Sequence, residues 1–232
     1  MSAPLSLTVL ISGRGTNLQA LVDAIGESRI RAAVGAVVCD RPEAAGLERA
    51  RRAGLDTAVI DRKGFASREA FENDLALAID SSRPDLIVLA GFMRVLDRQF
   101  VSRYPGNMIN IHPSLLPAYR GLHTHRRVLE AGETEHGASV HFVTPELDGG
   151  PVISQVRLAV DPGQTPEELA RRLLPLEHEL LVRTVALFCQ QRVKLRDEQV
   201  YVDEKPLASP LDPGVGRPAD HHPLGHPDES RG

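Results

Sequence analysis

The feature that most constrains the fold is a repeated alternation between short apolar runs and segments with helical spacing. An apolar run at residues 5–12 leads through a glycine turn into residues 18–25, where apolar side chains recur at helical spacing. The same alternation predicts further strands at 33–39, 57–60 and 85–91, and helices at 42–53 and 67–81. A run that is apolar throughout, such as 85–91, is typical of a strand buried on both faces of a parallel sheet. We therefore expect an α/β fold, with an open, doubly wound, mostly parallel sheet of the Rossmann type.

The later part of the chain predicts a change in the sheet and then an end to the folded domain. A short strand at 108–112 runs into Pro113, two more strands are expected at 138–144 and 152–160, and residues 166–191 have the pattern of a long helix. The sheet should become mixed here. After Lys205 the chain is rich in Pro, Gly, Asp and His and lacks apolar periodicity. We expect one domain over residues 1–205 and a disordered tail over residues 206–232.

Composition narrows the class of partner. The chain has 232 residues, 42% hydrophobic and 25% charged, with a formal net charge of −4, which is typical of a globular protein and gives no basic character for nucleic acid. No segment reaches the roughly 20 apolar residues of a membrane helix, and the N-terminus lacks the features of a signal peptide. The two cysteines, Cys39 and Cys189, form no paired motif. These features predict a cytoplasmic protein that acts on small molecules, without nucleic acid or membrane as a partner.

A glycine turn at residues 12–17 lies where the first strand meets the first helix. Its sequence, Ser-Gly-Arg-Gly-Thr-Asn, offers backbone N–H groups, a hydroxyl and an amide at the positive end of a helix, which suits a phosphate. Leu18 occupies the third glycine position of the dinucleotide fingerprint, and no Walker motif is present. From the turn alone, a phosphate site and a tight turn needed only for packing both remain open.

Asn110 and His112 are two residues apart on an expected strand, so their side chains project from the same face. An amide can donate to a developing oxyanion, and an imidazole can carry a proton near neutral pH. Asp148, flanked by Gly149 and Gly150, could approach and orient that imidazole. The alternative is that the first two are polar residues at a strand end and that Asp148 only forms a turn. The other histidines show no recognised ligand spacing, so we expect no metal.

Five segments resemble, in order, the motifs of the glycinamide ribonucleotide formyltransferases. They are residues 12–20 (SGRGTNLQA), 89–94 (LAGFMR), 110–117 (NIHPSLLP), 121–125 (GLHTH) and 147–151 (LDGGP). The resemblance extends over about residues 5–203 and implies the formyltransferase fold. It also implies formyl transfer from 10-formyltetrahydrofolate, the co-substrate, to the amine of glycinamide ribonucleotide in purine biosynthesis. Leu174 and Arg120 depart from the pattern, since relatives carry a polar residue at the first position and some carry proline at the second.

The resemblance also implies residue roles. It makes Asn110, His112 and Asp148 the catalytic group. It assigns the substrate phosphate and ribose to four residues, Gly15, Thr16, Asn17 and Glu177. It assigns the folate to the loop from Val143 to Asp148 and, individually, to Phe92, Met93, Arg94, Leu96, Val143 and Thr144.

Three rival functions share parts of this pattern. A formyltetrahydrofolate hydrolase and a methionyl-tRNA formyltransferase resemble the chain in the same catalytic trio, but they carry an added regulatory domain or RNA-binding domain, which we do not expect here. A non-catalytic nucleotide-binding module would use the glycine turn and leave Asn110, His112 and Asp148 idle. The sequence favours the ribonucleotide formyltransferase.

Overall fold

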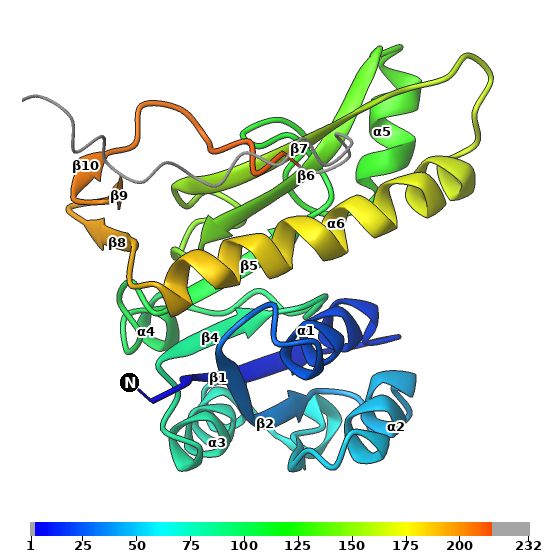
Figure 1. Cartoon of the computed structure of the whole chain (residues 1–232). Coiled ribbons are helices and arrows are strands. Elements are labelled where there is room, and N and C mark those ends of the chain that lie inside the picture. Colours follow the sequence, from blue (N-terminus) through cyan, green and yellow to red (C-terminus); the bar gives the residue numbers. More distant parts are fainter. Residues whose placement is uncertain (1–2, 215–232) are drawn as a thin grey trace, which may run out of the picture.

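The computed structural model describes residues 3–214 and is built around a seven-stranded sheet (Figure 1). The strands are β1 (Leu5–Ile11), β2 (Ala32–Cys39), β3 (Thr57–Val59), β4 (Leu86–Leu89), β5 (Met108–His112), β6 (Glu135–Phe142) and β7 (Val152–Ala159). Their order is β3-β2-β1-β4-β5-β6-β7. The pairs from β3 to β5 are parallel, whereas β6 and β7 pair antiparallel. The predicted doubly wound, mostly parallel sheet with a mixed C-terminal portion is confirmed.

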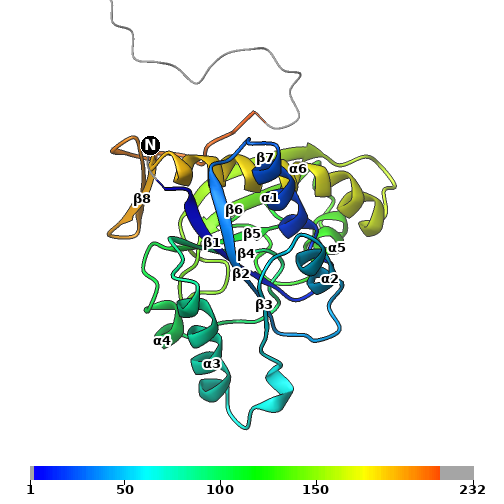
Figure 2. The same cartoon turned by 60° about the horizontal axis from the view of Figure 1, so that its bottom comes forward.

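Helices cover both faces of the sheet, as Figure 2 shows. One face carries α1 (Thr16–Gly26), α2 (Ala45–Arg52) and α6 (Pro166–Cys189), and the other carries α3 (Arg68–Ser81) and α4 (Arg98–Val101). Successive side chains of a strand point to opposite faces, and β1 follows this rule: Val9 and Ile11 belong to the first core, and Leu10 to the second. A strand with two buried faces must be apolar throughout, which explains the continuous runs in the sequence.

Helix α6 begins at a well-formed capping box. The Thr165 side chain accepts from the backbone N–H of Glu168, and the Glu168 carboxylate accepts from the backbone N–H of Thr165. Pro166 occupies the first turn, where a missing N–H costs nothing. The expected long helix with an internal Pro175 is therefore present. Helix α2 begins at Ala45, three residues later than expected, because residues 41–44 form a turn in which Ala44 N–H donates to Arg41.

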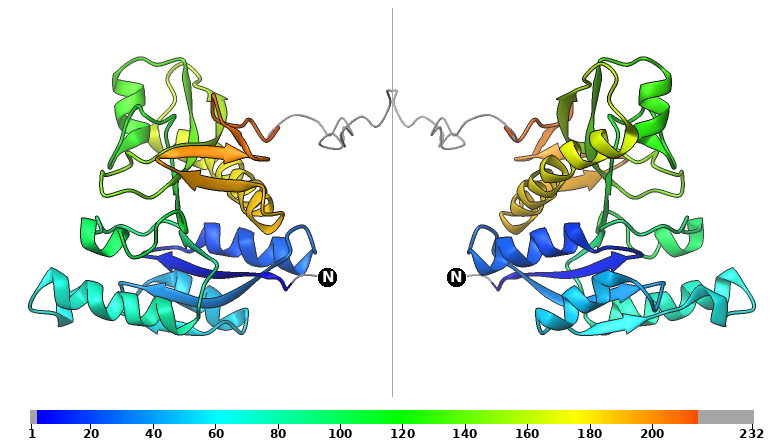
Figure 3. Two further views of the ribbon diagram at one scale, coloured as in Figure 1. Left: turned by 90° about the vertical axis from the view of Figure 1, so that its left-hand side faces the viewer. Right: turned by 90° about the vertical axis from the view of Figure 1, so that its right-hand side faces the viewer.

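Several shorter elements complete the fold. They are the 3₁₀ turn η1 (Arg62–Gly64), α4, α5 (Thr124–Glu130), and a small antiparallel sheet of β8 (Val193–Arg196), β9 (Gln199–Val202) and β10 (Lys205–Pro206). Figure 3 shows this sheet beyond the C-terminal end of α6. Within residues 3–214, none of the helices combines the length and hydrophobicity that crossing a bilayer requires.

The ordered chain continues beyond the expected boundary at residue 205. Leu211 N–H donates to Ile153 and its carbonyl accepts from Gln155 N–H, both at 2.9 Å, so residue 211 pairs with the edge strand β7. Leu207 and Leu211 also pack against the main core. Residues 206–214 are therefore not part of a disordered tail, because two leucines supply the apolar contacts that the surrounding composition hides. The rest of the predicted tail, 215–232, lies outside the described residues.

Candidate active site

One edge of the sheet brings together the glycine turn, the segment after β4 and the end of β5, which carries Asn110 and His112. Strands β1, β4 and β5 are parallel neighbours, so their carboxyl ends share an edge. The chain order reverses between β1 and β4, and a crevice forms at such a switch point. The glycine turn follows β1, and its Ser12 is tied to the segment after β4: Ser12 N–H donates to Gly91 at 3.2 Å, and its hydroxyl accepts from Met93 N–H at 2.8 Å.

The structure brings Asn110, His112 and Asp148 together. The Asn110 amide nitrogen lies 3.4 Å from Asp148 Oδ1, and His112 Nδ1 lies 3.4 Å from Asp148 Oδ2. His112 Nε2 lies 3.1 Å from the Tyr119 carbonyl oxygen. Both ring nitrogens of His112 thus face acceptors, and a protonated ring could donate to both. An amide donor and an imidazole with a carboxylate partner can together stabilise an oxyanion and move a proton.

Asp148 reaches this position through a tightly constrained loop between β6 and β7. Its backbone has a φ of 46°, in the left-handed region, and its Oδ2 accepts from Gly121 N–H at 2.9 Å. A Cβ on Gly150 would lie 1.9 Å from the Phe142 carbonyl oxygen, so the chain passes where only glycine fits. The loop therefore fixes the carboxylate in place.

His141 is a site residue that the sequence analysis did not single out. It is the cross-strand partner of Asn110 in the β5–β6 pair, and its Nε2 lies 3.1 Å from the Asn110 amide nitrogen and 3.6 Å from Asp148 Oδ1. Its Nδ1 lies 2.8 Å from the Phe142 carbonyl oxygen, so we assign the proton to Nδ1 and leave Nε2 to accept from Asn110. His141 thus orients the amide. The antiparallel register was the only signal for this contact, and the sequence does not give that register.

In this site, burial and the neighbouring charges shift the pKa values of His112 and Asp148 in opposite directions. Burial lowers the pKa of His112, although Asp148 and the Tyr119 carbonyl favour the charged ring. For Asp148, burial alone would raise the pKa, but the neighbouring His141 ring, the charge of His112 and the Gly121 N–H outweigh it and lower the pKa. The side chains are only 8% and 10% exposed. Asp148 is therefore ionised at neutral pH, and negative charge that develops beside His112 would favour its protonated ring.

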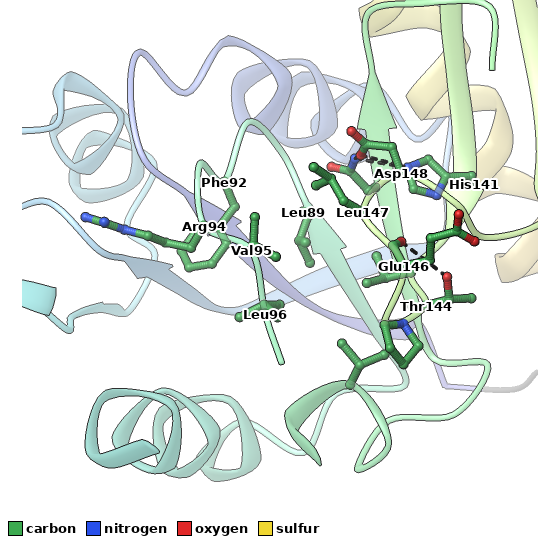
Figure 4. Close-up of a pocket in the computed structure, with 14 residues that line it drawn as sticks. Leu89, Phe92, Arg94, Val95, Leu96, His141, Thr144, Glu146, Leu147 and Asp148 are labelled. Atoms are coloured by element: carbon green, nitrogen blue, oxygen red, sulfur yellow. Dashed lines mark hydrogen bonds and ion pairs between the residues drawn. The ribbon is translucent and has the colours of Figure 1, made fainter. Parts of the chain in front are cut away.

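A pocket beside this group contains most of the residues predicted to bind folate (Figure 4). Its lining includes Asn110, His141 and Asp148 on one side and the segment after β4 on the other. The predicted folate residues that line it are Phe92, Arg94, Leu96, Val143 and Thr144. Met93 is the exception: it is not among the lining residues, and it is 57% exposed.

Two charged residues near the pocket have protein partners. The Arg94 side chain turns away from the pocket in Figure 4, and its Nε donates to Asp40 Oδ2 at 2.5 Å. Arg120, a departure from the family pattern, pairs with Glu146 of the pocket loop. Both arginines can still offer further N–H groups, because a guanidinium carries five.

The predicted phosphate turn has the required backbone form. Gly15 has a φ of 68°, and a Cβ there would lie 2.7 Å from the Gly46 Cα, so glycine is needed for conformation and for space. Helix α1 begins at Thr16 with its first N–H groups free of side-chain caps. Thr16 lines a groove of about 350 Å³ between α1 and α6.

Asn17 and Glu177 lie together beneath the turn and are both 8% exposed. Burial raises the pKa of Glu177 to about 7, although Asn17 and Arg14 oppose the shift. Asn17 Oδ1 is buried without a hydrogen-bond partner in the described part of the chain. A protonated Glu177 could donate to such an acceptor. The structure therefore brings the four residues predicted for phosphate and ribose to one end of α1.

The remaining histidines of the described chain do not form a ligand cluster. His125 Nδ1 lies 2.9 Å from His136 Nε2, so this pair shares a hydrogen bond. Within residues 3–214, no group of three or more His, Cys, Asp or Glu side chains is placed to hold a metal ion. His221, His222 and His226 lie outside the described residues.

Comparisons with known proteins agree with this geometry. The family profile described as "Formyl transferase" matches residues 5–185. The chain is 47% identical over 203 residues to phosphoribosylglycinamide formyltransferase of Escherichia coli, covering 88% of this chain and 96% of the relative. It is 45% identical over 183 residues to the trifunctional purine biosynthetic protein adenosine-3 of Drosophila melanogaster, covering 78% of this chain and 14% of that protein.

A solved structure gives the same result in three dimensions. The phosphoribosylglycinamide formyltransferase of Coxiella burnetii has a TM-score of 0.85 with 51% identity, covering 88% of this chain and 96% of that one. The predicted fold is thus seen in an enzyme of this class. The chain belongs to the formyl transferase family.

Proposed function

We propose that this chain transfers the formyl group of 10-formyltetrahydrofolate to the amine of glycinamide ribonucleotide, a step of de novo purine biosynthesis. The observation that carries the proposal is the cluster of Asn110, His112 and Asp148 beside the pocket at the sheet edge. The family match and the 47% identity to a phosphoribosylglycinamide formyltransferase support the same acceptor. The two free cysteines fit a reducing compartment, so we also propose that the enzyme works in the cytoplasm.

The chemistry needs no covalent enzyme intermediate. The neutral amine attacks the formyl carbon, and a tetrahedral intermediate forms with negative charge on the formyl oxygen. Asn110 and the imidazolium of His112 stabilise that oxyanion by hydrogen bonds: the amide N–H that faces Asp148 and the ring N–H that faces the Tyr119 carbonyl turn to the substrate oxygen. The former amine loses one proton, the folate nitrogen gains one, and the bond between that nitrogen and the formyl carbon breaks. The products are the formylated ribonucleotide and tetrahydrofolate.

The position of Asp148 gives His112 its role. Because burial lowers the pKa of His112, the ring takes up its proton as negative charge develops on the substrate. Asp148, at 3.4 Å from Nδ1, stabilises the resulting imidazolium. The same carboxylate, directly or through a water molecule, passes the proton of the attacking amine to His112, and the imidazolium gives it to the folate nitrogen as the bond to the formyl carbon breaks. His141 acts as a positioning residue by holding the Asn110 amide.

The two substrates would approach the catalytic group from different sides. Gly15, Thr16 and Asn17 bind the ribonucleotide phosphate at the start of α1, and Glu177 contacts its ribose. The folate enters the pocket formed by the segment after β4 and the loop from Val143 to Asp148. Phe92 and Leu96 provide apolar contacts for a flat ring system there.

The test is acceptor dependence. Purified protein given 10-formyltetrahydrofolate should release tetrahydrofolate rapidly only when glycinamide ribonucleotide is present, because the phosphate anchor brings the amine to the formyl carbon. Free glycinamide, which lacks ribose and phosphate, should be a poor acceptor. Rapid turnover in water alone would instead indicate a hydrolase. Turnover only with charged initiator tRNA would indicate a tRNA enzyme, and no turnover with any acceptor would indicate a binding module.

A further inference from the structure

Helix α3 carries a buried carboxylate that the proposed mechanism does not use. Glu72 is only 4% exposed, and its Oε1 accepts from Arg68 Nε at 2.8 Å. Burial raises the pKa of Glu72, and Arg68 opposes that shift. Its Oε2 is buried and has no hydrogen-bond partner among the described residues. Burying a carboxyl group with one oxygen left without a hydrogen-bond partner costs folding free energy, so other contacts of Glu72 must account for its position.

Glu72 and Arg68 both bind the backbone of the segment that follows β4. Glu72 Oε1 accepts from Asp97 N–H at 3.1 Å, and Arg68 Nη2 donates to the Val95 carbonyl oxygen at 2.5 Å. The two residues are one helical turn apart on α3 and are joined by their own ion pair. We refer to Arg68 and Glu72 as the α3 bracket. It holds both ends of the three-residue segment 95–97.

This segment forms the wall of the pocket opposite the catalytic group. Val95 and Leu96 line the pocket, across from His141 and Asp148 (Figure 4). Leu96 is 6% exposed and packs with Phe92 and Phe100 in the second core. Asp97 then caps α4 by accepting from Phe100 N–H at 2.7 Å. The bracket thus fixes the segment between two packed elements.

We propose that Glu72 is a positioning residue for the formyl donor: through Asp97 N–H and Arg68 it sets the pocket wall against which the folate binds. The inference rests on the proposed function, because it takes this pocket as the folate site. Glu72 touches neither the pocket nor the catalytic group, so it acts only through the segment 95–97. Its loss should weaken folate binding and leave the phosphate turn unaffected, because that turn is bonded to Gly91 and Met93 rather than to residues 95–97.

The experiment compares three variants by steady-state kinetics, varying each substrate in turn. Glu72→Leu removes both hydrogen bonds and should raise the KM for 10-formyltetrahydrofolate by about tenfold. The kcat and the KM for glycinamide ribonucleotide should stay within about twofold of wild type. Glu72→Gln can keep its amide oxygen as the acceptor for both Arg68 and Asp97 but loses the negative charge that pairs with Arg68, so its KM for the folate should lie between those of wild type and Glu72→Leu. Glu69→Gln is the matched control, because Glu69 lies on the same helix, is exposed, and has no hydrogen bond to the segment within residues 3–214.

Amide hydrogen exchange provides a readout that is independent of activity. Exchange at the Asp97 N–H should be faster in Glu72→Leu than in wild type or Glu69→Gln. An unchanged folate KM in Glu72→Gln and Glu72→Leu would overturn the proposal, as would equal rises in both substrate KM values, which indicate general loosening. If Glu72→Leu does not fold, the Gln variant decides by the same criteria. If the wild-type protein showed no formyl transfer, the proposed function would be refuted instead. The exchange measurement would then still test the α3 bracket, and an unchanged exchange rate at the Asp97 N–H in Glu72→Leu would overturn it.

Discussion

Replacing Asp148 by Asn tests whether a carboxylate charge enables His112 to act. The asparagine has nearly the same size, and its oxygen can still accept from Gly121 N–H, which the aspartate does at 2.9 Å. The left-handed backbone at this position also tolerates asparagine. The variant should therefore fold with the loop in place. What it loses is the negative charge 3.4 Å from His112 Nδ1.

The distance sets the size of the effect. Two unit charges 3.4 Å apart interact by about 5 kcal/mol at an effective dielectric constant of about 20. Both side chains are about nine-tenths buried, so solvent screens the pair little. The amide of the variant can form other hydrogen bonds, which offset part of this energy. A loss of about 3–5 kcal/mol in the transition state corresponds to a decrease in kcat of about 100-fold to 10,000-fold.

The assay is kcat at saturating concentrations of both substrates across pH 6–9, together with the melting temperature of each variant. Glu135→Gln is the matched control, since Glu135 is an exposed carboxylate that pairs with Arg157 and lies outside the pocket lining. The control should lose less than about threefold in kcat, because exposed ion pairs contribute little. If Asp148→Asn kept kcat within a few-fold of wild type at every pH, the charge argument would be wrong.

Three further predictions concern other parts of the chain. Asn17→Ala should weaken the binding of glycinamide ribonucleotide more than that of folate, because it removes a donor at the phosphate turn; equal losses in calorimetric titration would contradict the role. Deleting residues 206–232 should lower the melting temperature by about 4–8 °C, since Leu207 and Leu211 are worth about 2 kcal/mol, whereas deleting only 215–232 should change it by less than about 1 °C. Burial and the neighbouring His125 lower the pKa of His136 to about 4, so its contribution to stability is complete above about pH 6.5 and is lost as the pH falls towards 4. The free energy of unfolding measured in urea should fall between pH 7 and pH 5, and this fall should be smaller in His136→Gln by about 2 kcal/mol. Equal falls in the two proteins would refute the assignment.

The parallel half of the fold could be predicted because its strands are buried on both faces and so read as unbroken apolar runs. The small sheet β8–β10 could not, because its turns lack the usual signal. Asp197 and Glu198 connect β8 to β9 with φ values of 47° and 61°. Asn-Gly or Asp-Gly normally marks such a turn, since glycine adopts this conformation without strain. Two acidic residues in the left-handed region give a hairpin that the sequence does not indicate.

The candidate site was predictable where its residues are close in sequence. Asn110 and His112 share a face because strand periodicity requires it, and the glycine turn lies where a helix follows a strand. His141 was missed because its contact with Asn110 depends on the register between β5 and β6, which is set over 31 residues by packing. Met93 differs from its neighbours: Phe92 and Arg94 line the pocket, whereas Met93 is not among the lining residues and is 57% exposed.

The mixed sheet explains why both substrates can meet at one carbon atom. The parallel strands give a switch point where the start of α1 can bind a phosphate, but they supply no carboxylate above the end of β5. Strand β6 runs antiparallel to β5 and ends at Phe142, level with Ile109, so the loop before β7 folds back along β5 and brings Asp148 to Asn110 and His112. The antiparallel addition therefore converts a nucleotide-binding architecture into one with a charged proton carrier beside the bound amine.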